Sequence, residues 1–321
     1  MEIIGVIMPW IVLIVGLVLL IKGADWFVEG ASGVAAKFGV PSLVIGLTIV
    51  AFGTSAPEAA VSISSALKGS SGIALGNVVG SNLFNLLAVV GVCSVMRPTV
   101  IDKSIIKKDF PYNLLATVVL AITMIDTFFG DLPVNVISRT DGLIIIAFFA
   151  IFMYYTISAG LSGKAEADKE KKIYSIPKLI ILLVVGIAAI VIGGQAVVNG
   201  ASDIARSFGV SETLIGLTIV AVGTSLPEFV TSVVAIRKGE DDIAIGNVVG
   251  SNVFNILFII GIAATIKSIP VDAALITDIL MLLAISLIFY FSVLRKRTVN
   301  RAGGIVMVLA YLLYMAYAVI R

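Results

Sequence analysis

The 321-residue sequence contains no histidine and only one cysteine, Cys93. The lack of histidine excludes imidazole metal ligands and histidine-based catalysis, and a single thiol excludes a disulfide framework or a thiolate metal cluster. Charged residues make up only 13% of the chain, about half the share usual in a soluble protein. The net charge of +2 provides no basic excess for binding nucleic acid. These absences argue against a soluble, disulfide-stabilised or nucleic-acid-binding protein.

Hydrophobic residues, by contrast, make up 59% of the chain, and the mean hydropathy is +1.13. Apolar runs of roughly 18 or more residues recur, long enough to cross ~30 Å of hydrocarbon as helices. The first, Ile3 to Val28, is too long for a signal-peptide core and has no basic leader, so we expect it in the mature protein. Hydropathy breaks predict an all-α polytopic membrane protein with ten spans, near 5–29, 40–67, 72–96, 111–126, 140–160, 176–200, 210–236, 243–266, 272–294 and 303–320.

The chain repeats itself. Residues Gly46–Gly91 and Gly216–Gly261 align without a gap at an offset of 170, and 27 of their 46 positions are identical. The identities fall mostly on Gly, Thr, Ser, Pro, Glu and Asn rather than on apolar residues, and each copy holds one carboxylate, Glu58 or Glu228, inside a strongly apolar stretch. A repeat that keeps its polar residues indicates a site built jointly by two halves.

The polar segment 162–175 divides a first repeat, residues 1–161, from a second, residues 176–321, within one membrane domain. If both termini are extracellular, the cytoplasmic loops receive 16 basic residues and the opposite side 5, as the positive-inside rule requires. Five spans per half then place the second copy in the membrane in the opposite sense. The prediction is an inverted repeat of two five-helix halves, a plan common among secondary transporters.

The motif GTSxPE occurs in spans two and seven, as Gly53–Glu58 and Gly223–Glu228. Its proline has no amide hydrogen, so we expect both helices to be broken there, with carbonyl oxygens turned out of the helical ladder. The Thr and Ser hydroxyls lie four and three positions before the glutamate, on one face where the helix resumes. Carbonyls, hydroxyls and two carboxylates form an oxygen ligand set suited to Ca²⁺, whose charge the carboxylates match.

Not every polar residue of these spans calls for a functional role. For Ser62, Ser232, Thr48 and Thr218 we expect hydrogen bonds to carbonyls of their own helices. The glutamates differ, because a mid-membrane carboxylate costs about 3 kcal/mol or more without a partner. Neither Glu58 nor Glu228 has a basic residue nearby in sequence. An ion is the expected partner.

The motif GNVVGSNxFN occurs in spans three and eight, at 76–85 and 246–255. Its two glycines, four apart, are typical of closely packed helices, so packing is their expected role in both copies. The serine and final asparagine, Ser81 with Asn85 and Ser251 with Asn255, are also four apart and face one way. They are expected to add neutral oxygens to the site. For Asn77, Asn82, Asn247 and Asn252, about half are expected to link or cap helices instead.

Paired GTSxPE and GNxxGSNxxN motifs in two inverted halves closely resemble the sodium/calcium exchangers of the cation/calcium antiporter superfamily, in their compact prokaryotic form. The resemblance implies that Glu58 and Glu228 bind Ca²⁺ together with carbonyls of Thr54 and Thr224. It also implies Na⁺ sites completed by the following residues, with the two asparagines at the centre: Ala51, Ser55, Ser81, Asn85, Ala221, Ser225, Ser251 and Asn255. The first and sixth helices, in Met1–Lys37 and Ile176–Arg206, would slide across the core to switch access.

Two departures from the family's pattern narrow the function. Many relatives carry an aspartate at the position of Asn255, and in K⁺-dependent relatives that aspartate is tied to K⁺ binding, so asparagine here favours K⁺-independent transport. The large regulatory loop of eukaryotic exchangers is also absent, and the acidic run Glu240–Asp242 is expected to be a solvated loop. Asp25 and Glu29 align with Gln195 and Asn199 in the other copy and are left outside the site.

The function predicted is electrogenic exchange of Na⁺ for Ca²⁺ across the cell membrane by alternating access, with no protein partner or cofactor implied. A Ca²⁺/H⁺ antiporter on the same fold is the nearest alternative, since either glutamate could exchange a proton for Ca²⁺. A cation channel is a further alternative, but inverted symmetry favours alternating access. An enzyme is the least expected class, because the glutamates have no nucleophile–base arrangement beside them.

Overall fold

The computed structural model describes residues 2–68, 71–129, 134–162, 174–210 and 215–320. The linker predicted at 162–175 therefore lies mostly outside the described residues. In the first half the helices, with π-helical turns written η, are α1 (Glu2–Phe38), α2 (Ser42–Ile45), η1 (Gly46–Val50), α3 (Ala51–Thr54), α4 (Ala56–Leu67), α5 (Ser71–Leu83), η2 (Phe84–Val89), α6 (Val90–Met96), η3 (Ile105–Asp109), α7 (Phe110–Thr123), α8 (Asp126–Phe129) and α9 (Arg139–Ser162). In the second they are α10 (Ile176–Ser207), η4 (Gly216–Val220), α12 (Ala221–Gly223), α13 (Leu226–Lys238), α14 (Asp241–Val253), η5 (Phe254–Ile260), α15 (Gly261–Ile266), α16 (Ala273–Val293) and α17 (Arg301–Ile320).

The membrane class is confirmed by the lengths and composition of these helices. Within the described residues, seven helices are long and apolar enough to cross a bilayer, and a bent pair, Ser42–Thr54 with Ala56–Leu67, makes an eighth span with a 51° bend. The two other expected spans are near 111–126, where α7 is only 14 residues long, and 210–236, which includes residues 211–214 outside the described part. The count of ten spans stays a prediction.

Four short strands of two residues each lie in the loops of this otherwise helical protein. The strand β1 (Thr99–Val100) pairs antiparallel with β4 (Thr298–Val299), and β2 (Val136–Ile137) pairs antiparallel with β3 (Ile269–Pro270). They form because extended loops next to helix ends have backbone groups that still need partners. Each pairing joins a loop of the first half to a loop of the second, and β3 begins 170 positions after β1. The pairing therefore follows the repeat seen in the sequence.

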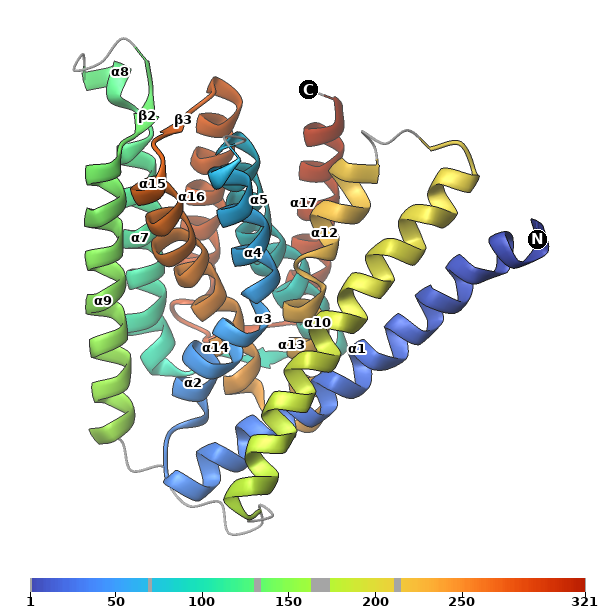
Figure 1. The fold of residues 1–321 in the computed structure, drawn as a ribbon. Coiled ribbons are helices and arrows are strands. Elements are labelled where there is room, and N and C mark those ends of the chain that lie inside the picture. The colour runs from blue at the N-terminus through green and yellow to red at the C-terminus, as the bar shows by residue number, and fades with distance from the viewer. Residues whose placement is uncertain (1, 69–70, 130–133, 163–173, 211–214, 321) are drawn as a thin grey trace.

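Helices α1 and α10 form a long antiparallel pair that crosses one side of the bundle (Figure 1). Glycines bring the two backbones together: a Cβ atom at Gly193 of α10 would lie 2.5 Å from the amide nitrogen of Leu20, and one at Gly16 of α1 would lie 2.9 Å from the carbonyl oxygen of Gly193. Contacts this close are possible only without side chains. The pair thus forms a distinct unit lying against the rest of the protein.

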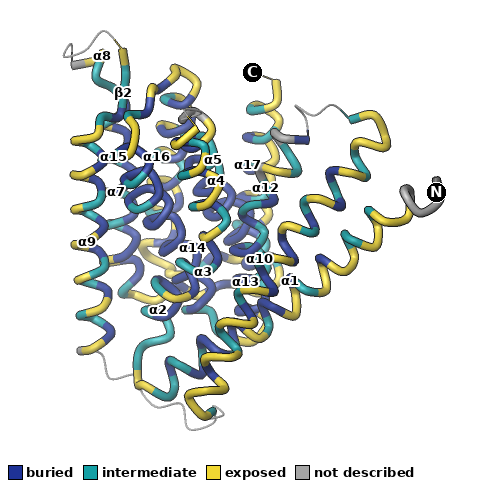
Figure 2. The backbone as a smooth tube through the Cα atoms, viewed as in Figure 1, coloured by how far each residue is buried: buried dark blue, intermediate teal, exposed yellow. Residues whose placement is uncertain are grey.

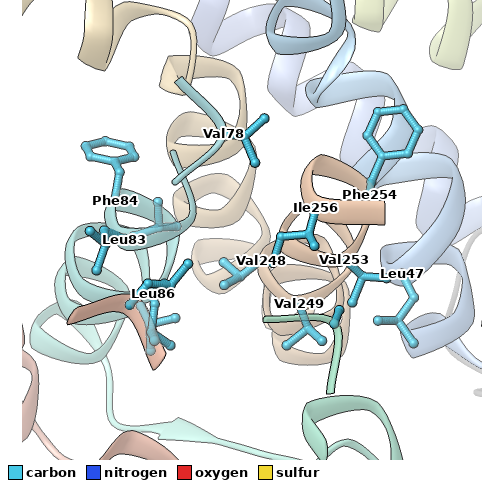
Figure 3. Close-up of a cluster of buried hydrophobic side chains, with 14 of the residues drawn as sticks. Leu47, Val78, Leu83, Phe84, Leu86, Val248, Val249, Val253, Phe254 and Ile256 are labelled. Carbon is cyan, nitrogen blue, oxygen red and sulfur yellow. The ribbon is translucent and has the colours of Figure 1, made fainter. Parts of the chain in front are cut away.

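The centre of the protein is built by α5 with η2 and α14 with η5, whose residues are mostly buried, while α9, α1 and α10 expose apolar faces (Figure 2). Figure 3 shows part of this centre, with Leu83, Phe84 and Leu86 of the first half on one side and Val248, Val253 and Phe254 of the second on the other. The exposed apolar side chains are those that contact lipid in a membrane protein. The buried centre is where the repeated motifs lie.

The motif glycines pack closely in only one copy. A Cβ atom at Gly250 would lie 2.6 Å from the carbonyl oxygen of Leu47, and one at Gly246 would lie 2.9 Å from that of Leu43. At Gly80, the same position of the first copy, no described atom from outside its own helix lies within 4 Å, and at Gly76 the nearest such atom lies at 3.8 Å. Among the described residues, the expected close packing is therefore seen in the second copy and not in the first, because α14 packs against η1 and α3 whereas α5 is not packed in the same way against η4.

Candidate functional site

The two glutamates lie in the first turn of a helix that follows a break. In the first half α3 ends at Thr54, Ser55 has φ −81° and ψ 5°, and α4 begins at Ala56. In the second half Ser225 has φ −92° and ψ 4° before α13 begins at Leu226. Proline is tolerated in a first helical turn, where its missing amide hydrogen has no helical acceptor. The GTSxPE motif thus breaks both helices, and places each glutamate near a helix N-terminus, where negative charge is favoured.

Each glutamate is bound by a serine of the opposite repeat. The Ser55 hydroxyl donates to Glu228 Oε1 at 2.7 Å, and the Ser225 hydroxyl lies 2.9 Å from Glu58 Oε1. Ser225 Oγ also lies 2.9 Å from Ser81 Oγ. These contacts bring the two GTSxPE motifs together around one centre, although their glutamates are 170 residues apart in the chain. The centre is therefore shared by both halves.

This centre holds two carboxyl groups without a described protein counter-ion. Both glutamate residues are fully buried, and neither forms an ion pair with a described basic side chain. Within the described residues, Glu58 Oε2 and Glu228 Oε2 have no hydrogen-bond partner. An ionised carboxylate in an apolar interior is costly unless a charge or several hydrogen bonds stabilise it. Two carboxylate oxygens without described partners in one buried centre could serve as ligands to a cation.

Four asparagines cross-link the halves beside the glutamates. Asn85 donates from Nδ2 to Asn252 Oδ1 at 3.1 Å, and Asn255 donates from Nδ2 to Asn82 Oδ1 at 3.1 Å. Asn82 Nδ2 also donates to the Asn252 carbonyl oxygen at 3.1 Å. Asn85 Oδ1 and Asn255 Oδ1 are buried and lack partners within the described residues. The amide nitrogens thus hold both side chains while their oxygens remain available to a ligand.

The remaining residues implied by the family resemblance also come from these helices. Ala51 begins α3 and Ala221 begins α12, one turn before each helix break. The structure buries Thr54, Ser81 and Ser251, whereas Thr224 is only partly buried. The Thr54 hydroxyl lies within hydrogen-bond distance of Val50 O, Ala51 O and Asn247 Oδ1. All twelve residues therefore lie on the broken helices or on α5, α14 and the π-helical turns that follow them.

Two serines have roles that the sequence reasoning missed, whereas their partners Asn77 and Asn247 link helices as expected of some of the asparagines. Asn77 donates to Ser62 Oγ at 3.0 Å, and Asn247 donates to Ser232 Oγ at 3.0 Å, so each pair ties the helix after the break to the next helix. The expectation that Ser62 and Ser232 bond only within their own helices was wrong, whereas Thr48 does bond to Val44 O of its own span. The signal was the equal separation of 15 residues in both copies, which the spacing rules for a single helix do not cover.

Acidic residues outside the motifs lie away from this centre. Asp25 of α1 pairs with Lys238 at 2.8 Å, and Glu29 accepts a hydrogen bond from the Tyr174 hydroxyl. Glu240 accepts from Ser32 at 2.5 Å, and Asp241 pairs with Arg97 at 3.1 Å, so the acidic run is tied to other elements rather than simply solvated. Within the described residues there is no group of three or more Asp, Glu, Cys or His arranged to hold a metal. The glutamate centre relies on neutral oxygens instead.

Known proteins match over almost the whole chain. The family model described as sodium/calcium exchanger protein matches residues 8–158 and 178–320. The putative antiporter CaxA of Alkalimonas amylolytica is 36% identical over 318 residues, covering 95% of this chain and 96% of CaxA. The sodium/calcium exchanger MaX1 of Methanosarcina acetivorans is 33% identical, covering 95% of this chain and 97% of MaX1.

The fold matches a solved exchanger as well. The sodium-calcium exchanger NCX_Mj, soaked with 2.5 mM Na⁺ and 0.1 mM Ca²⁺, superposes with a TM-score of 0.84 at 29% identity, covering 97% of this chain and 98% of that one. A match of this length includes both broken helices and both copies of the asparagine motif. With the family model matching each half in turn, the chain is a membrane transporter rather than an enzyme, and it belongs to the sodium/calcium exchanger protein family.

Proposed function

We propose that this protein exchanges Na⁺ for Ca²⁺ across the cell membrane by alternating access, with both ions competing for the centre between Glu58 and Glu228. The observation that carries the proposal is the pair of free, fully buried carboxylate oxygens, one from each half, in a centre without a described basic partner. Relatives named as sodium/calcium exchangers support the choice of ions. The ions are the transported substrates and not resident cofactors.

The charge of the centre favours an electrogenic exchange. Two carboxylates are neutralised by one Ca²⁺, whereas three Na⁺ leave a surplus positive charge. Ca²⁺ takes 6–8 oxygens in flexible geometry. Two free carboxylate oxygens supply only part of that number. The remainder is assigned to the hydroxyls of Ser55, Ser81, Ser225 and Ser251, the amide oxygens of Asn85 and Asn255, and the carbonyls of Ala51, Thr54, Ala221 and Thr224. Ca²⁺ and Na⁺ thus occupy the same set of oxygen ligands in turn.

Independence of K⁺ follows from the two central asparagines. Both Asn85 and Asn255 are neutral, and each is held through its amide nitrogen by an asparagine of the other half. The centre therefore carries only the two glutamate charges, without a third carboxylate for an additional monovalent ion. We infer that external K⁺ leaves the exchange unchanged.

The architecture assigned to this mechanism is two inverted halves, residues 1–161 and 176–321, with five spans each. The strand pairings support it, because β1 with β4 and β2 with β3 relate loops of opposite halves in the same way. The excess of basic residues in one set of loops supports extracellular termini. In this frame α1 and α10, packed through glycines, are the mobile pair that exposes the centre to one side at a time.

The burial of the site residues supports access from one side in this structure. A cavity of about 410 Å³ lies beside α10 and η4, lined by residues that include Gln195, Asn199 and Val220. Thr224, Asn77 and Gly80 on the same side of the centre are only partly buried, whereas Asn247 and Thr54 of the equivalent positions are fully buried. With extracellular termini, this cavity opens to the extracellular side. The proposal assigns it as the route by which ions reach the centre.

Reconstituted vesicles test the function directly. Purified protein is placed in liposomes loaded with Na⁺, which are diluted into Na⁺-free medium, and ⁴⁵Ca²⁺ uptake is followed with and without a pH gradient and with and without external K⁺. The expected result is uptake driven by the Na⁺ gradient, unaffected by K⁺, and accelerated by an inside-positive potential because net positive charge leaves. Liposomes with equal Na⁺ on both sides serve as the control.

Other outcomes of the same assay identify the alternatives. Uptake driven by the pH gradient and indifferent to Na⁺ would make the protein a Ca²⁺/H⁺ antiporter on this fold. Ca²⁺ flux down its own gradient, at channel-like rates and without a counter-ion, would contradict exchange altogether.

The serines that cross between repeats give a further prediction. Ser55→Ala and Ser225→Ala each remove a hydroxyl that contacts a glutamate of the other half. A hydrogen bond to a charged group contributes about 1.5–3 kcal/mol, so the apparent affinity for Ca²⁺ or Na⁺ is expected to fall roughly ten- to hundredfold. The affinity is measured from uptake rates at varied ion concentration. Ser94→Ala, a buried serine bonded to Thr99 outside the centre, is the matched control and is expected to leave the affinity unchanged. If all three variants had the same apparent ion affinity, Ser55 and Ser225 would not contribute to the ion site.

A further inference from the structure

A groove of about 440 Å³ lies between α16 and α17, in a part of the molecule that the ion site does not use. Its volume falls in the range usual for sites that bind small molecules. Phe289 and Met307 form buried walls, while Ile288 and Val306 are 69% and 64% exposed at its rim. Lys296, Thr298 and Asn300 line one end. The groove is therefore apolar along its length and polar at a single mouth.

The groove exists because α16 and α17 are held by different neighbours. Helix α16 packs against α7 and α5, and α17 packs against α6 and η2, but α16 and α17 make at most slight contact with each other. In the first half, α7 does pack against α9: the ring centroids of Tyr112 and Phe152 are 5.3 Å apart, and the Tyr112 hydroxyl donates to Phe148 O at 2.6 Å. The residue 170 positions after Tyr112 is Leu282. In the first half the Tyr112 ring fills the space between α7 and α9, whereas in the second half the space between α16 and α17 is left open as the groove.

Positive charge gathers at the mouth of the groove. Arg295, Lys296, Arg297 and Arg301 lie within seven consecutive residues, and the sequence has no acidic residue after Asp278. From another element, Asp102 interacts with Arg297, and Asp102 also lines a separate cavity together with the acidic run Glu240–Asp242. None of the four basic residues forms an ion pair with a described residue. The mouth therefore carries a net positive charge that is free to bind an anion.

We propose that this groove binds an anionic phospholipid, with an acyl chain between α16 and α17 and the phosphate at Lys296. A groove that opens to hydrocarbon is filled by apolar chains, and basic pockets between membrane helices bind anionic headgroups. The arrangement of an apolar length and a basic end matches a molecule with a long chain and a charged head. The short connection between α16 and α17, with β4 paired to β1, fixes the basic mouth relative to the groove. The site does not depend on which ions the protein transports.

Native mass spectrometry of the full chain in a neutral detergent tests the headgroup. Phosphatidylglycerol is expected to bind at a ratio of one and more tightly than phosphatidylcholine with the same acyl chains. One basic residue near a membrane surface contributes about 1 kcal/mol of attraction, so Lys296→Gln is expected to weaken phosphatidylglycerol binding about fivefold and to leave phosphatidylcholine binding unchanged. Lys107→Gln removes an exposed basic residue on η3 that does not line the groove, and should change neither. Equal binding of the two lipids, or equal effects of the two substitutions, would overturn the proposal.

A second pair of variants tests the apolar part. Ala310→Phe places a ring in the groove and is expected to abolish binding of both lipids at this site, whereas Leu313→Phe, on a side chain that is 72% exposed on the same helix, should leave binding intact. The thermal midpoint of each variant in detergent shows whether it has kept its fold. If Ala310→Phe unfolds the protein, the Lys296→Gln comparison decides the question, because that side chain is exposed. A lipid-independent dimer that Ala310→Phe disrupts would mean that a second copy fills the groove, contrary to the proposal.

Discussion

Replacing either central glutamate by glutamine, Glu58→Gln or Glu228→Gln, is expected to reduce Na⁺-driven Ca²⁺ uptake at least about a hundredfold. Both side chains are fully buried, and the free oxygen of each has no described protein partner. A unit charge about 4 Å from an opposite unit charge contributes about 4 kcal/mol at an effective dielectric constant of 20, or roughly a thousandfold in affinity. Glutamine is less costly to bury, which offsets part of the loss. Two losses of equal size are expected, because each glutamate supplies half of the charge.

The measurement is ⁴⁵Ca²⁺ uptake into Na⁺-loaded liposomes in both directions of the gradient, together with the amount of folded protein recovered. Glu29→Gln is the matched control, since Glu29 is bound to Tyr174 outside the centre, and uptake within about twofold of the unsubstituted protein is expected, as for surface changes. The glutamine variants should fold at least as well, because a buried charge is removed. If either glutamine variant exchanged ions at the rate of the unsubstituted protein, the assignment of this centre as the ion site would be wrong.

The second large effect concerns two glycines that share one motif. Gly250→Ala is expected to destabilise the protein, because its Cβ atom would lie 2.6 Å from the Leu47 carbonyl oxygen and 2.8 Å from the Ala51 Cβ atom. Overpacking a tight contact costs about 1–3 kcal/mol. Gly80→Ala adds the same methyl group where no described atom from outside its own helix lies within 4 Å, and replacing a mid-helix glycine contributes roughly 0.5–1 kcal/mol of stability. The thermal midpoint in detergent should therefore fall for Gly250→Ala and stay level or rise for Gly80→Ala.

For Gly80→Ala and Gly250→Ala, the change in transport rate is not expected to follow the change in thermal stability. In this structure α14 packs against Gly46–Ala51. If the two halves exchange conformations when access switches from one side of the membrane to the other, α5 packs in the same way against residues 216–221 in the opposite state. A methyl group at Gly80 then meets the backbone only in that opposite state. An overpacking cost of about 1.4–3 kcal/mol lowers the population of that state roughly ten- to hundredfold. Gly80→Ala is accordingly expected to be a well-folded protein with severely reduced exchange.

Ca²⁺ binding and turnover separate these effects. Gly80→Ala should bind Ca²⁺ from the proposed extracellular access side with unchanged affinity, while ⁴⁵Ca²⁺ uptake is slowed at least about tenfold. Ala59→Gly, an exchange of the same two residue types on α4, reports on any general effect of altered helix stability. Normal uptake by Gly80→Ala would show that the first copy never packs as the second does here, and would exclude exchange of the two packings as the switching motion.

The sequence predicted the parts of this protein that depend on the cost of polar groups in hydrocarbon. The helical membrane class followed from apolar length, and the helix breaks followed from Pro57 and Pro227, whose missing amide hydrogens act locally. Glu58 and Glu228 were singled out because a buried carboxylate requires a partner wherever it lies. The resemblance to exchangers rested on the same polar residues, and the family assignment is confirmed. Their role as ion ligands, and the ten-span count, stay predictions.

What the sequence alone determined, then, is the membrane class, the repeat, the two helix breaks and the two acids, because each depends on composition or on residues close together in the chain. Only the tertiary structure decided that Ser55 contacts Glu228 rather than Glu58, that Asn85 and Asn255 are held by asparagines of the other half, and that α16 and α17 leave a groove. The glycines give the physical reason: Gly80 and Gly250 lie in the identical sequence GNVVGSN, yet one faces open space and the other touches a backbone. Identical local sequences cannot encode that difference, which arises from the neighbours that the rest of the fold brings to each.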